Sequence, residues 1–297
     1  MPRLSSSEEA REIEWGITIP SLDLSRSPDP PKAIARVDME NSLLVREESE
    51  IATLIFNRPE ARNALSAEII AGLPRELSRI ERRGDIRVVI LRGAGGKAFA
   101  SGADLAEMAG MDSTAALQQL SRFEAMLEAI ETCEVPVIAM IEGYAIGGGC
   151  EVATACDLRI ATADARFGIP IARIGHTLDF RNARRLMALI GPAILKELLF
   201  TDRIIDAAEA HRIGLISAVI PREDIEAHTY RLAREMTQKA PLSLRATKRV
   251  IRECMHNPSL QGIENPAALA AACFDTEDFK EGVRAFFEKR TPRFLGR

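Results

Sequence analysis

The sequence is poor in aromatic residues and carries no strong excess of one charge. Phe, Trp and Tyr make up 5% of 297 residues, and 39 Lys and Arg oppose 43 Asp and Glu, for a formal net charge of −4. Proteins that bind nucleic acid use a positive field against the phosphates and aromatic platforms against the bases. We therefore expect no nucleic-acid partner.

Long hydrophobic runs and paired cysteines are also missing from the sequence. The apolar run at 135–141 is typical, and it is far shorter than the roughly 18 residues that span a bilayer. The first 15 residues are charged and lack the apolar stretch of a secretory signal. None of the five cysteines form a CxxC pair, and no histidine lies at metal-ligand spacing from them. We predict free thiols, a cytoplasmic location, no membrane association and no metal.

The N-terminal residues differ in character from the rest of the chain. Residues 25–31 read SRSPDPP, a composition typical of irregular linkers, so we predict an irregular arm over 1–37. Regular patterning follows, with two β-like runs at 42–46 and 51–56 that predict a hairpin. Ser66 is the expected N-cap of an amphipathic helix that ends near Arg83.

Buried strands then recur along the chain at intervals of about 45 to 50 residues. The runs at 88–91, 137–141 and 158–161 are continuously apolar, which suits strands covered on both faces. Turns and helical patterns separate them, so we predict an α/β core of ββα-like units over 38–220. From Pro221 the pattern is helical, and we predict a helical C-terminal region over 221–297.

Two glycine-bearing segments follow buried strands and lead toward helices. They are 97–105, KAFASGADL, and 142–151, EGYAIGGGCE. Glycine lets a ligand approach the backbone closely, and free N–H groups at the start of a helix carry partial positive charge. Two such groups that converge on one oxygen form an oxyanion hole. The alternative is a pair of tight turns that bind nothing.

These segments, taken with several others, resemble the enoyl-CoA hydratase/isomerase family, also called crotonases. The other matching pieces are NRP at 57–59, NAL at 63–65, CDLRIA at 156–161, ARFG at 165–168, GLI at 214–216, APL at 240–242 and FFEKRTP at 286–292. They occur in the family's order and spacing from about residue 40 to the end of the chain. The arm lies outside the resemblance.

The resemblance implies a fold, a substrate and a pair of amide donors. The fold is a crotonase-like spiral of ββα units with a C-terminal helical region that forms trimers, which often pair into hexamers. The substrate is an acyl-CoA thioester, so coenzyme A belongs to the substrate and no separate cofactor is expected. The family stabilises a thioester enolate between two backbone N–H groups, which by position belong to Ser101 and Gly148.

The catalytic carboxylates that the resemblance implies are only partly present. Hydratases of the family use two glutamates, and the first corresponds to Glu151. The position of the second, directly after FGIP at 167–170, holds Ile171. Asp179 lies before an apolar stripe of helical spacing that ends ahead of Gly191, so we expect it to cap a helix that stops there. Its alternative role is a replacement carboxylate that faces the acyl group.

The resemblance also implies contacts with CoA. Ala103, Asp104 and Leu105 match the stretch that lines the adenine pocket, and Arg62 lies near the entry of the CoA chain. Phe286 and Lys289 match residues that close over CoA, often from a neighbouring subunit. We expect His176 to be structural. For the cluster of Arg181, Arg184 and Arg185 we expect a solvated or intersubunit face, with binding of a substrate carboxylate as the alternative.

The sequence thus favours an enoyl-CoA hydratase. Because the second glutamate is replaced, two alternatives stay open. One is another crotonase reaction, namely isomerisation, decarboxylation or thioester hydrolysis. The other is a CoA-binding protein with little catalysis.

Overall fold

The computed structural model describes residues 34–36, 42–263 and 265–297 of the chain. These residues belong to one unit, 33–297. The arm predicted over 1–37 lies outside the described residues, except for 34–36, which form strand β1 (Ile34–Arg36).

A seven-stranded sheet forms the larger layer of the fold. Its order is β1, β2 (Leu43–Glu48), β3 (Ile51–Phe56), β4 (Val88–Gly93), β6 (Val137–Ile141), β8 (Leu158–Thr162) and β11 (Ala218–Ile220). β2 and β3 form the predicted antiparallel hairpin, and all later pairings are parallel. The central strands are buried on both faces, as their continuous apolar runs predict.

A smaller sheet carries the second strand of each repeating unit. Its order is β10 (Ile205–Asp206), β9 (Arg166–Gly168), β7 (Tyr144–Ile146) and β5 (Ala98–Ala100). The pairs β4 and β5, β6 and β7, and β8 and β9 each give one strand to the large sheet and the next to the small sheet before a helix follows. This is the spiral of ββα units that the sequence predicted. Because β5, β7 and β9 run parallel, their carboxyl ends meet at one edge.

Helices fill the space beside the sheets. They are α1 (Ala67–Arg83), α2 (Leu105–Met108), α3 (Ser113–Thr132), α4 (Gly148–Ala155), α5 (Phe180–Thr201) and α6 (Ala207–Arg212), with short 3-10 turns at Pro59–Ala61, Ala94–Gly96 and Ala172–Ile174. Ser66 caps α1 as predicted, because its hydroxyl accepts the N–H of Ile69. α5 extends past the expected end: Gly191, at φ 72° and ψ 162°, kinks it before Pro192, and a second segment continues to Thr201.

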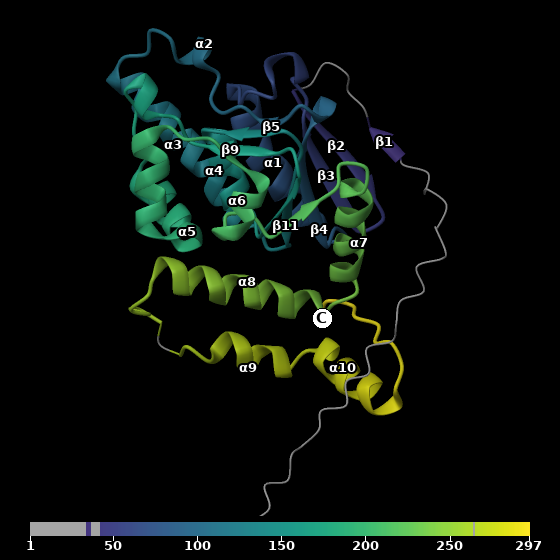
Figure 1. Cartoon of the computed structure of the whole chain (residues 1–297). Helices are drawn as coiled ribbons and strands as arrows, with labels where there is room; N and C mark the ends of the chain where they lie inside the picture. Colours follow the sequence, from purple (N-terminus) through teal and green to yellow (C-terminus); the bar gives the residue numbers. More distant parts are fainter. Residues whose placement is uncertain (1–33, 37–41, 264) are drawn as a thin grey trace, which may run out of the picture. The chain divides into compact units, whose positions relative to one another are not determined.

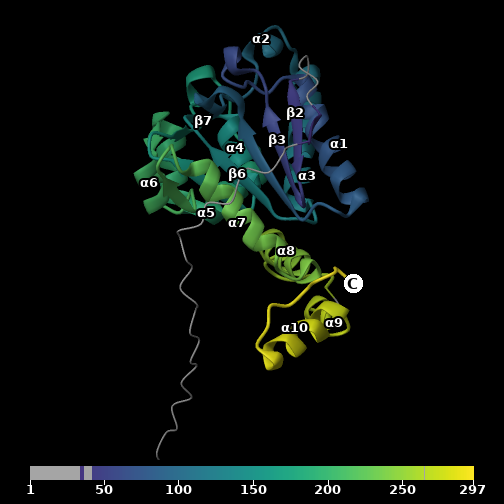
Figure 2. The same ribbon diagram turned by 90° about the vertical axis from the view of Figure 1, so that its right-hand side faces the viewer.

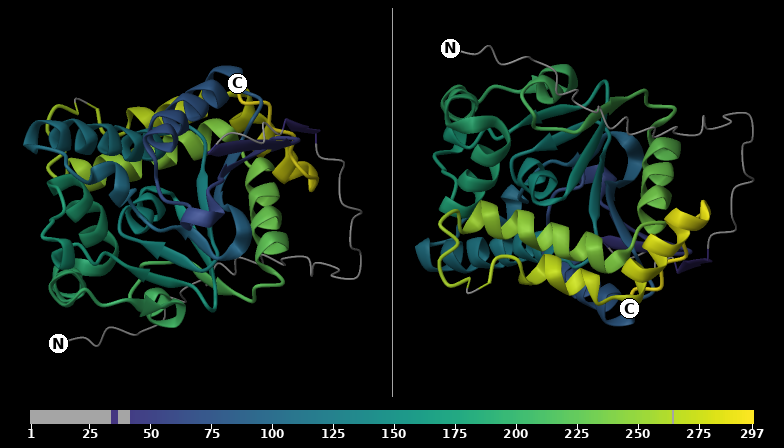
Figure 3. Two further views of the ribbon diagram at one scale, coloured as in Figure 1. Left: turned by 90° about the horizontal axis from the view of Figure 1, so that it is seen from above. Right: turned by 90° about the horizontal axis from the view of Figure 1, so that it is seen from below.

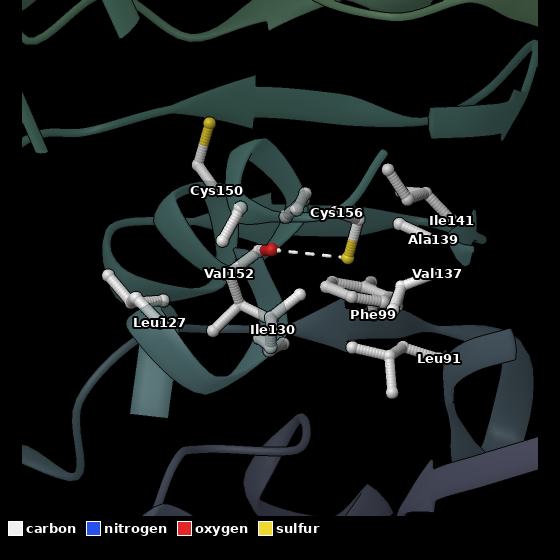
Figure 4. Packing of buried hydrophobic residues seen from close by; sticks show 14 of the residues in the cluster. Leu91, Phe99, Leu127, Ile130, Val137, Ala139, Ile141, Cys150, Val152 and Cys156 are labelled. Atoms are coloured by element: carbon white, nitrogen blue, oxygen red, sulfur yellow. Dashed lines mark hydrogen bonds between the residues drawn. The ribbon is translucent and has the colours of Figure 1, made fainter. Parts of the chain in front are cut away.

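The main core surrounds α4. Figure 4 shows Val152 of α4 and Cys156, the residue directly after α4, among Phe99, Ile130 and Val137. The Cys156 thiol donates to the carbonyl of Val152 at 3.4 Å. A second apolar cluster forms where α7 (Ile225–Thr237) covers the other face of the large sheet. α4 is therefore fixed on several sides, and it holds the second glycine-bearing turn in place.

The last helices lie along one side of the α/β region (Figures 1 and 3). They are α8 (Pro241–His256), α9 (Ala268–Phe274) and α10 (Glu277–Glu288), so the chain after Pro221 is largely helical as predicted. Lys248 of α8 connects this region to the core, since its ammonium group lies 2.7 Å from the Asp157 carboxylate and donates to two backbone carbonyls. Within the described ranges, no helix is both long enough and apolar enough to traverse a bilayer.

Candidate active site

Two glycine-bearing turns meet at the carboxyl edge of the small sheet. Ser101 follows β5, and Gly147 and Gly148 follow β7. A Cβ atom on Gly102 would lie 3.3 Å from the backbone nitrogen of Gly148, and one on Gly149 would lie 2.1 Å from the carbonyl oxygen of Ala100. Only glycine permits this close approach, which explains the glycines that the sequence places in both turns.

The amide donors of these turns are available for a ligand. Gly148 is the first residue of α4, so its N–H has no acceptor within the helix. In the facing turn, Leu65 forms a parallel bridge with Ala103, and its N–H donates to the Gly102 carbonyl at 2.8 Å. This register leaves the N–H of Ala103 out of the bridge. Ala103 is therefore a second candidate donor beside Ser101, and the sequence analysis did not consider it for this role.

A buried asparagine fixes the first turn against the loop after β3. The Asn63 amide donates to the carbonyls of Ala94 and Ala98 at 3.0 and 2.7 Å, and its oxygen accepts the N–H of Arg58 at 3.0 Å. Arg58 forms an ion pair with Asp104 at 2.9 Å. These contacts hold the candidate donors rigidly, which an oxyanion hole requires.

Glu151 lies in the first turn of α4, three residues after Gly148. It is 7% exposed, and among the described residues no basic group lies within 4.0 Å of its carboxylate. The pKa of Glu151 is raised to about 8, mainly by burial and further by the negative charges of Asp179 and Glu124, while Arg185 acts in the opposite direction. This carboxyl can therefore hold or release a proton near neutral pH, as a general acid or base must.

Asp179 is the N-cap of α5, as expected. Its carboxylate accepts the N–H groups of Arg181 and Asn182 at 2.8 and 2.9 Å and the side-chain amide of Asn182 at 2.8 Å. Its charge also raises the pKa of Glu151, so the two carboxyl groups lie close enough to interact electrostatically. The role of replacement carboxylate remains a prediction.

The expectation of a solvated or intersubunit arginine face is wrong for Arg185. Its side chain is 2% exposed and makes paired contacts with Glu124, at 2.7 and 2.9 Å, and with Glu131, at 2.8 Å. Because these carboxylates are on α3, more than 50 positions away, the arginine cluster alone could not reveal them. Their spacing of seven residues on one helix was the available signal.

The position of the missing second glutamate is apolar. Ile171 is partly buried and packs against the main core together with Leu178. Next to the Gly148 donor, an added Cβ atom on Gly148 would lie 3.1 Å from the Phe123 ring. His176 contributes a backbone bond, from its N–H to the carbonyl of Ile171 at 2.9 Å, in keeping with a structural role. The surroundings of the donors thus suit an apolar acyl group.

Of the residues predicted to contact CoA, one group lies in or near the donor turns and the other lies at the C-terminal end of the chain. Asp104 caps α2 by accepting the Ala106 N–H at 3.1 Å, and it directly follows Ala103 in the donor turn, with Leu105 next to it. Arg62 lies in the loop after β3, with its guanidinium 5.9 Å from the centre of the Tyr144 ring.

Phe286 and Lys289 belong to α10 and its C-terminal end, far along the chain from the donor turns. The Phe286 side chain is 77% exposed and contacts Phe287. Within one chain α10 contacts α9. That contact does not bring Phe286 and Lys289 to the donor turns.

In the described part of the chain, no cluster of three or more His, Cys, Asp or Glu side chains is arranged to hold a metal ion. Cys133, Cys150 and Cys156 are free and buried. Burial raises the pKa of the Cys150 and Cys156 thiols to about 12, so these two groups are unreactive packing residues.

Comparison with known proteins identifies the class to which this fold and site belong. The model of the family described as enoyl-CoA hydratase/isomerase matches residues 46–297. The chain belongs to this family. It is similar to the crotonyl-CoA hydratase of Syntrophomonas wolfei, at 36% identity over 258 residues, covering 87% of this chain and 99% of the relative.

Two further comparisons agree. The 2,3-dehydroadipyl-CoA hydratase of Escherichia coli is 34% identical over 258 residues, covering 86% of this chain and all of the relative. The crystal structure of the Bacillus anthracis enoyl-CoA hydratase superimposes with a TM-score of 0.82 at 34% identity, covering 86% of this chain and all of that chain. The predicted resemblance and the predicted crotonase-like fold are confirmed.

Proposed function

We propose that this protein is an enoyl-CoA hydratase that adds water across the double bond of a 2-enoyl-CoA. The observation that carries the proposal is the position of Glu151, which is buried one helical turn after the free N–H of Gly148. Relatives of similar length with hydratase names support the same reaction.

The thioester oxygen would lie between the N–H of Gly148 and that of Ser101 or Ala103. Negative charge grows on this oxygen as hydroxide adds to Cβ, and fixed donors stabilise that growth. In a one-carboxylate cycle, ionised Glu151 takes a proton from water as the C–O bond forms. The resulting acid returns that proton to Cα as the enolate collapses, so Glu151 ends ionised as it began.

In a two-carboxylate cycle, Asp179 would take a proton from the water as its oxygen adds to Cβ, and protonated Glu151 would supply the Cα proton. Asp179 would then lose its proton to solvent and Glu151 would regain one, which restores the starting state. The raised pKa of Glu151 suits the acid role, because much of the group is protonated at neutral pH. The product differs from the substrate by one water in both cycles.

Isomerisation is the second candidate, although Ile171 occupies the position of a glutamate that the familiar isomerases of the family keep. A shift of the double bond moves one proton between two carbons, and a single carboxyl group can carry it. Hydration instead profits from separate groups for water and carbon.

The test is an assay with crotonyl-CoA, in which hydration removes the absorbance of the conjugated double bond. Glu151→Gln keeps size and hydrogen bonding but cannot ionise, so we expect a loss in kcat of about 100-fold or more with little change in KM. Glu223→Gln, an exposed glutamate after β11, is the matched control and should keep full activity.

Three outcomes of this assay separate the alternatives. Full activity in Glu151→Gln would overturn the role of Glu151. Turnover of a 3-enoyl-CoA, with a gain of absorbance and no hydration, would replace the hydratase with an isomerase. Binding of CoA without turnover in the unmodified protein would favour a binding protein.

The proposal also includes the substrate contacts and the assembly. Ala103, Asp104 and Leu105 would line the adenine pocket, and Phe286 and Lys289 of a neighbouring subunit would close over CoA within a trimer or hexamer. The site needs no metal and no separate cofactor. The free cysteines suit the reducing cytoplasm that we propose as its location.

A further inference from the structure

The two oxygens of the Asp179 carboxylate have different partners. Oδ1 accepts the backbone N–H groups of Arg181 and Asn182 at 2.8 and 2.9 Å, and these two bonds form the cap of α5. Oδ2 accepts the side-chain amide of Asn182 at 2.8 Å. Because the cap uses only Oδ1, the bond to Oδ2 is additional to the start of the helix.

The side-chain amide of Asn182 is fixed from its other end by Arg185. Asn182 is 2% exposed, and its Oδ1 accepts a hydrogen bond from Nη1 of Arg185 at 3.0 Å. A guanidinium group only donates hydrogen bonds, so the amide oxygen must face Arg185 and the amide NH2 group must face Asp179. Arg185 therefore sets the direction of both hydrogen bonds.

Arg185 is in turn anchored from another helix. Its guanidinium pairs with Glu124 at 2.7 and 2.9 Å and with Glu131 at 2.8 Å, both on α3. Loss of the Asn182 side chain therefore leaves Arg185 with both of its charged partners. α3 and α5 each contact α4, whose first turn carries Glu151. The hydrogen bonds that start at Glu124 thus end at Asp179, a carboxylate whose charge acts on Glu151.

Charged groups from three helices make up this cluster. They are Glu124, Glu128 and Glu131 of α3, Arg181, Arg184 and Arg185 of α5, and His256 of α8. Burial is the main cause of the raised pKa of Glu151, Asp179 and Glu124 add to it, and Arg185 opposes it. A further negative charge at position 182 would therefore raise the pKa of Glu151 more.

We propose that Asn182 is a positioning residue of the active site: anchored by Arg185, its amide holds the Asp179 carboxylate as a fixed hydrogen-bond acceptor beside Glu151. This role rests on the proposed function in its two-carboxylate cycle. In that cycle an ionised Asp179 takes the proton of water, and a protonated Glu151 gives a proton to Cα. A donor that is held against Oδ2 stabilises the ionised carboxylate and fixes its orientation toward the water.

Asn182→Leu removes the amide, keeps a similar volume and leaves the backbone cap of α5 in place. We expect kcat for crotonyl-CoA to fall about 10-fold, because Oδ2 loses its donor, while KM changes little. Circular dichroism and thermal unfolding confirm that the variant is folded. Unchanged kcat in the folded variant would overturn the proposal.

Asn182→Asp keeps the shape of the side chain but turns an oxygen toward Oδ2 of Asp179. It still accepts the hydrogen bond from Arg185. Two carboxylates that face each other share a proton, because like charges raise one of their pKa values. The ratio of variant kcat to unmodified kcat should therefore rise about 10-fold from pH 6 to pH 8, as the shared proton leaves.

The matched control for this variant is Gln238→Glu, the same exchange of amide for acid at an exposed residue after α7. Its kcat ratio should stay close to one at every pH. A role of Asn182 in packing alone would lower the ratio of the Asn182→Asp variant equally at every pH, and such a flat ratio would overturn the proposal.

A double-mutant cycle tests whether Asn182 acts through Asp179. In the Asp179→Asn background no carboxylate remains to be held, so adding Asn182→Leu should change kcat less than about 2-fold. The same loss of about 10-fold in both backgrounds would show that Asn182 acts independently of Asp179, which contradicts the proposal.

Infrared spectroscopy measures the carboxyl groups without any turnover. The C=O band of a protonated carboxyl group that is missing from Glu151→Gln belongs to Glu151. Its titration midpoint should move to higher pH in Asn182→Asp and stay in place in Gln238→Glu. An unmoved midpoint in Asn182→Asp would overturn the placement of Asn182 in this network. If the proposed function fails, turnover is absent in the unmodified protein while the midpoint still moves.

Discussion

At the scale of single residues, burial decides how Glu151 ionises. Its carboxyl lies in the first turn of α4, where the partial positive charge of a helix start would favour the ionised form. Removal from water outweighs this effect, and the nearby charges of Asp179 and Glu124 act in the same direction as burial. A glutamate that can carry a proton at neutral pH is the result.

The raised pKa predicts how Glu151 affects stability with pH. Between about pH 4.5 and pH 8 the unfolded chain releases this proton while the folded chain retains it, so the Glu151 contribution to stability falls as pH rises. Glu151→Gln does not titrate. We therefore expect the variant to gain stability relative to the unmodified protein across this window, with a plateau above about pH 8.

Urea unfolding at pH 5, 6.5 and 8 measures this difference, at one protein concentration because assembly affects apparent stability. A difference in the free energy of unfolding that does not change with pH would contradict the raised pKa. Glu223→Gln, exposed on the surface, serves as the control and should show no such trend.

Asp179 can be tested by the same kind of conservative change. Asn accepts hydrogen bonds at an N-cap as well as Asp does, so Asp179→Asn should leave thermal stability intact. If Asp179 only caps α5, activity should change little. If it also activates water, kcat should fall about 100-fold. Loss of both stability and activity would contradict both roles.

At the scale of elements, the site depends on strand ends and helix starts. β5 and β7 end next to each other because they are paired in parallel, and α4 begins directly after Gly147. The free N–H of Gly148 is a consequence of helix geometry, since the first N–H groups of any helix lack an internal partner. In the other turn, which follows β5, the candidate amides of Ser101 and Ala103 belong to an extended segment and not to a helix start.

Proline substitutions identify the amide in the first turn. Proline has no N–H, so replacement of the donor should lower kcat by about 100-fold, the usual effect of losing one oxyanion-hole donor. The resemblance assigns this amide to Ser101, and the bridge register leaves that of Ala103 free. Assays of Ser101→Pro and Ala103→Pro distinguish the two.

Circular dichroism and thermal unfolding show which of the proline variants fold. Full activity in both folded variants would remove the oxyanion hole from this turn. A large loss in one of them assigns the donor to that residue.

The element boundaries show the reach of local sequence patterns. The Ser66 cap and the apolar stripe predicted α1 correctly from Ala67 to Arg83, and the continuous apolar run predicted β6 correctly. The α5 prediction stopped at Gly191, although the chain kinks there and the helix resumes. A glycine with positive φ can either end a helix or only kink it before a second helical segment. The spacing of apolar residues does not distinguish an end from a kink.

At the scale of the whole molecule, large apolar side chains on the C-terminal helices remain uncovered in one chain. Ile251, Phe274, Phe286 and Phe287 are all more than half exposed. Apolar groups concentrated on one region of a protein surface mark an interface. We therefore expect these side chains to be covered by a partner surface.

We expect a trimer or hexamer in solution, and multi-angle light scattering at micromolar concentration measures it. Phe286→Glu places a charge in the expected interface and should shift the protein toward smaller species. If Phe286 also closes over CoA, the same variant should raise KM for acyl-CoA as the protein shifts to smaller species. A monomeric unmodified protein would contradict this assembly.

The sequence by itself determined the hairpin, the buried strands β4, β6 and β8, helix α1, the two glycine-bearing turns, the candidate Glu151 and the family. These features depend on local periodicity, on capping and turn chemistry, and on motifs whose residues are close together in the chain. The loss of the second glutamate at Ile171 was equally visible.

The tertiary structure alone decided which distant charges meet. It buried Arg185 between Glu124 and Glu131, placed the charge of Asp179 beside Glu151, and linked Arg185 through Asn182 to Asp179. The physical reason is that the packing of α3, α4 and α5 brings together residues that lie far apart in the chain. Charge interactions depend on those distances and on burial, which no local pattern specifies.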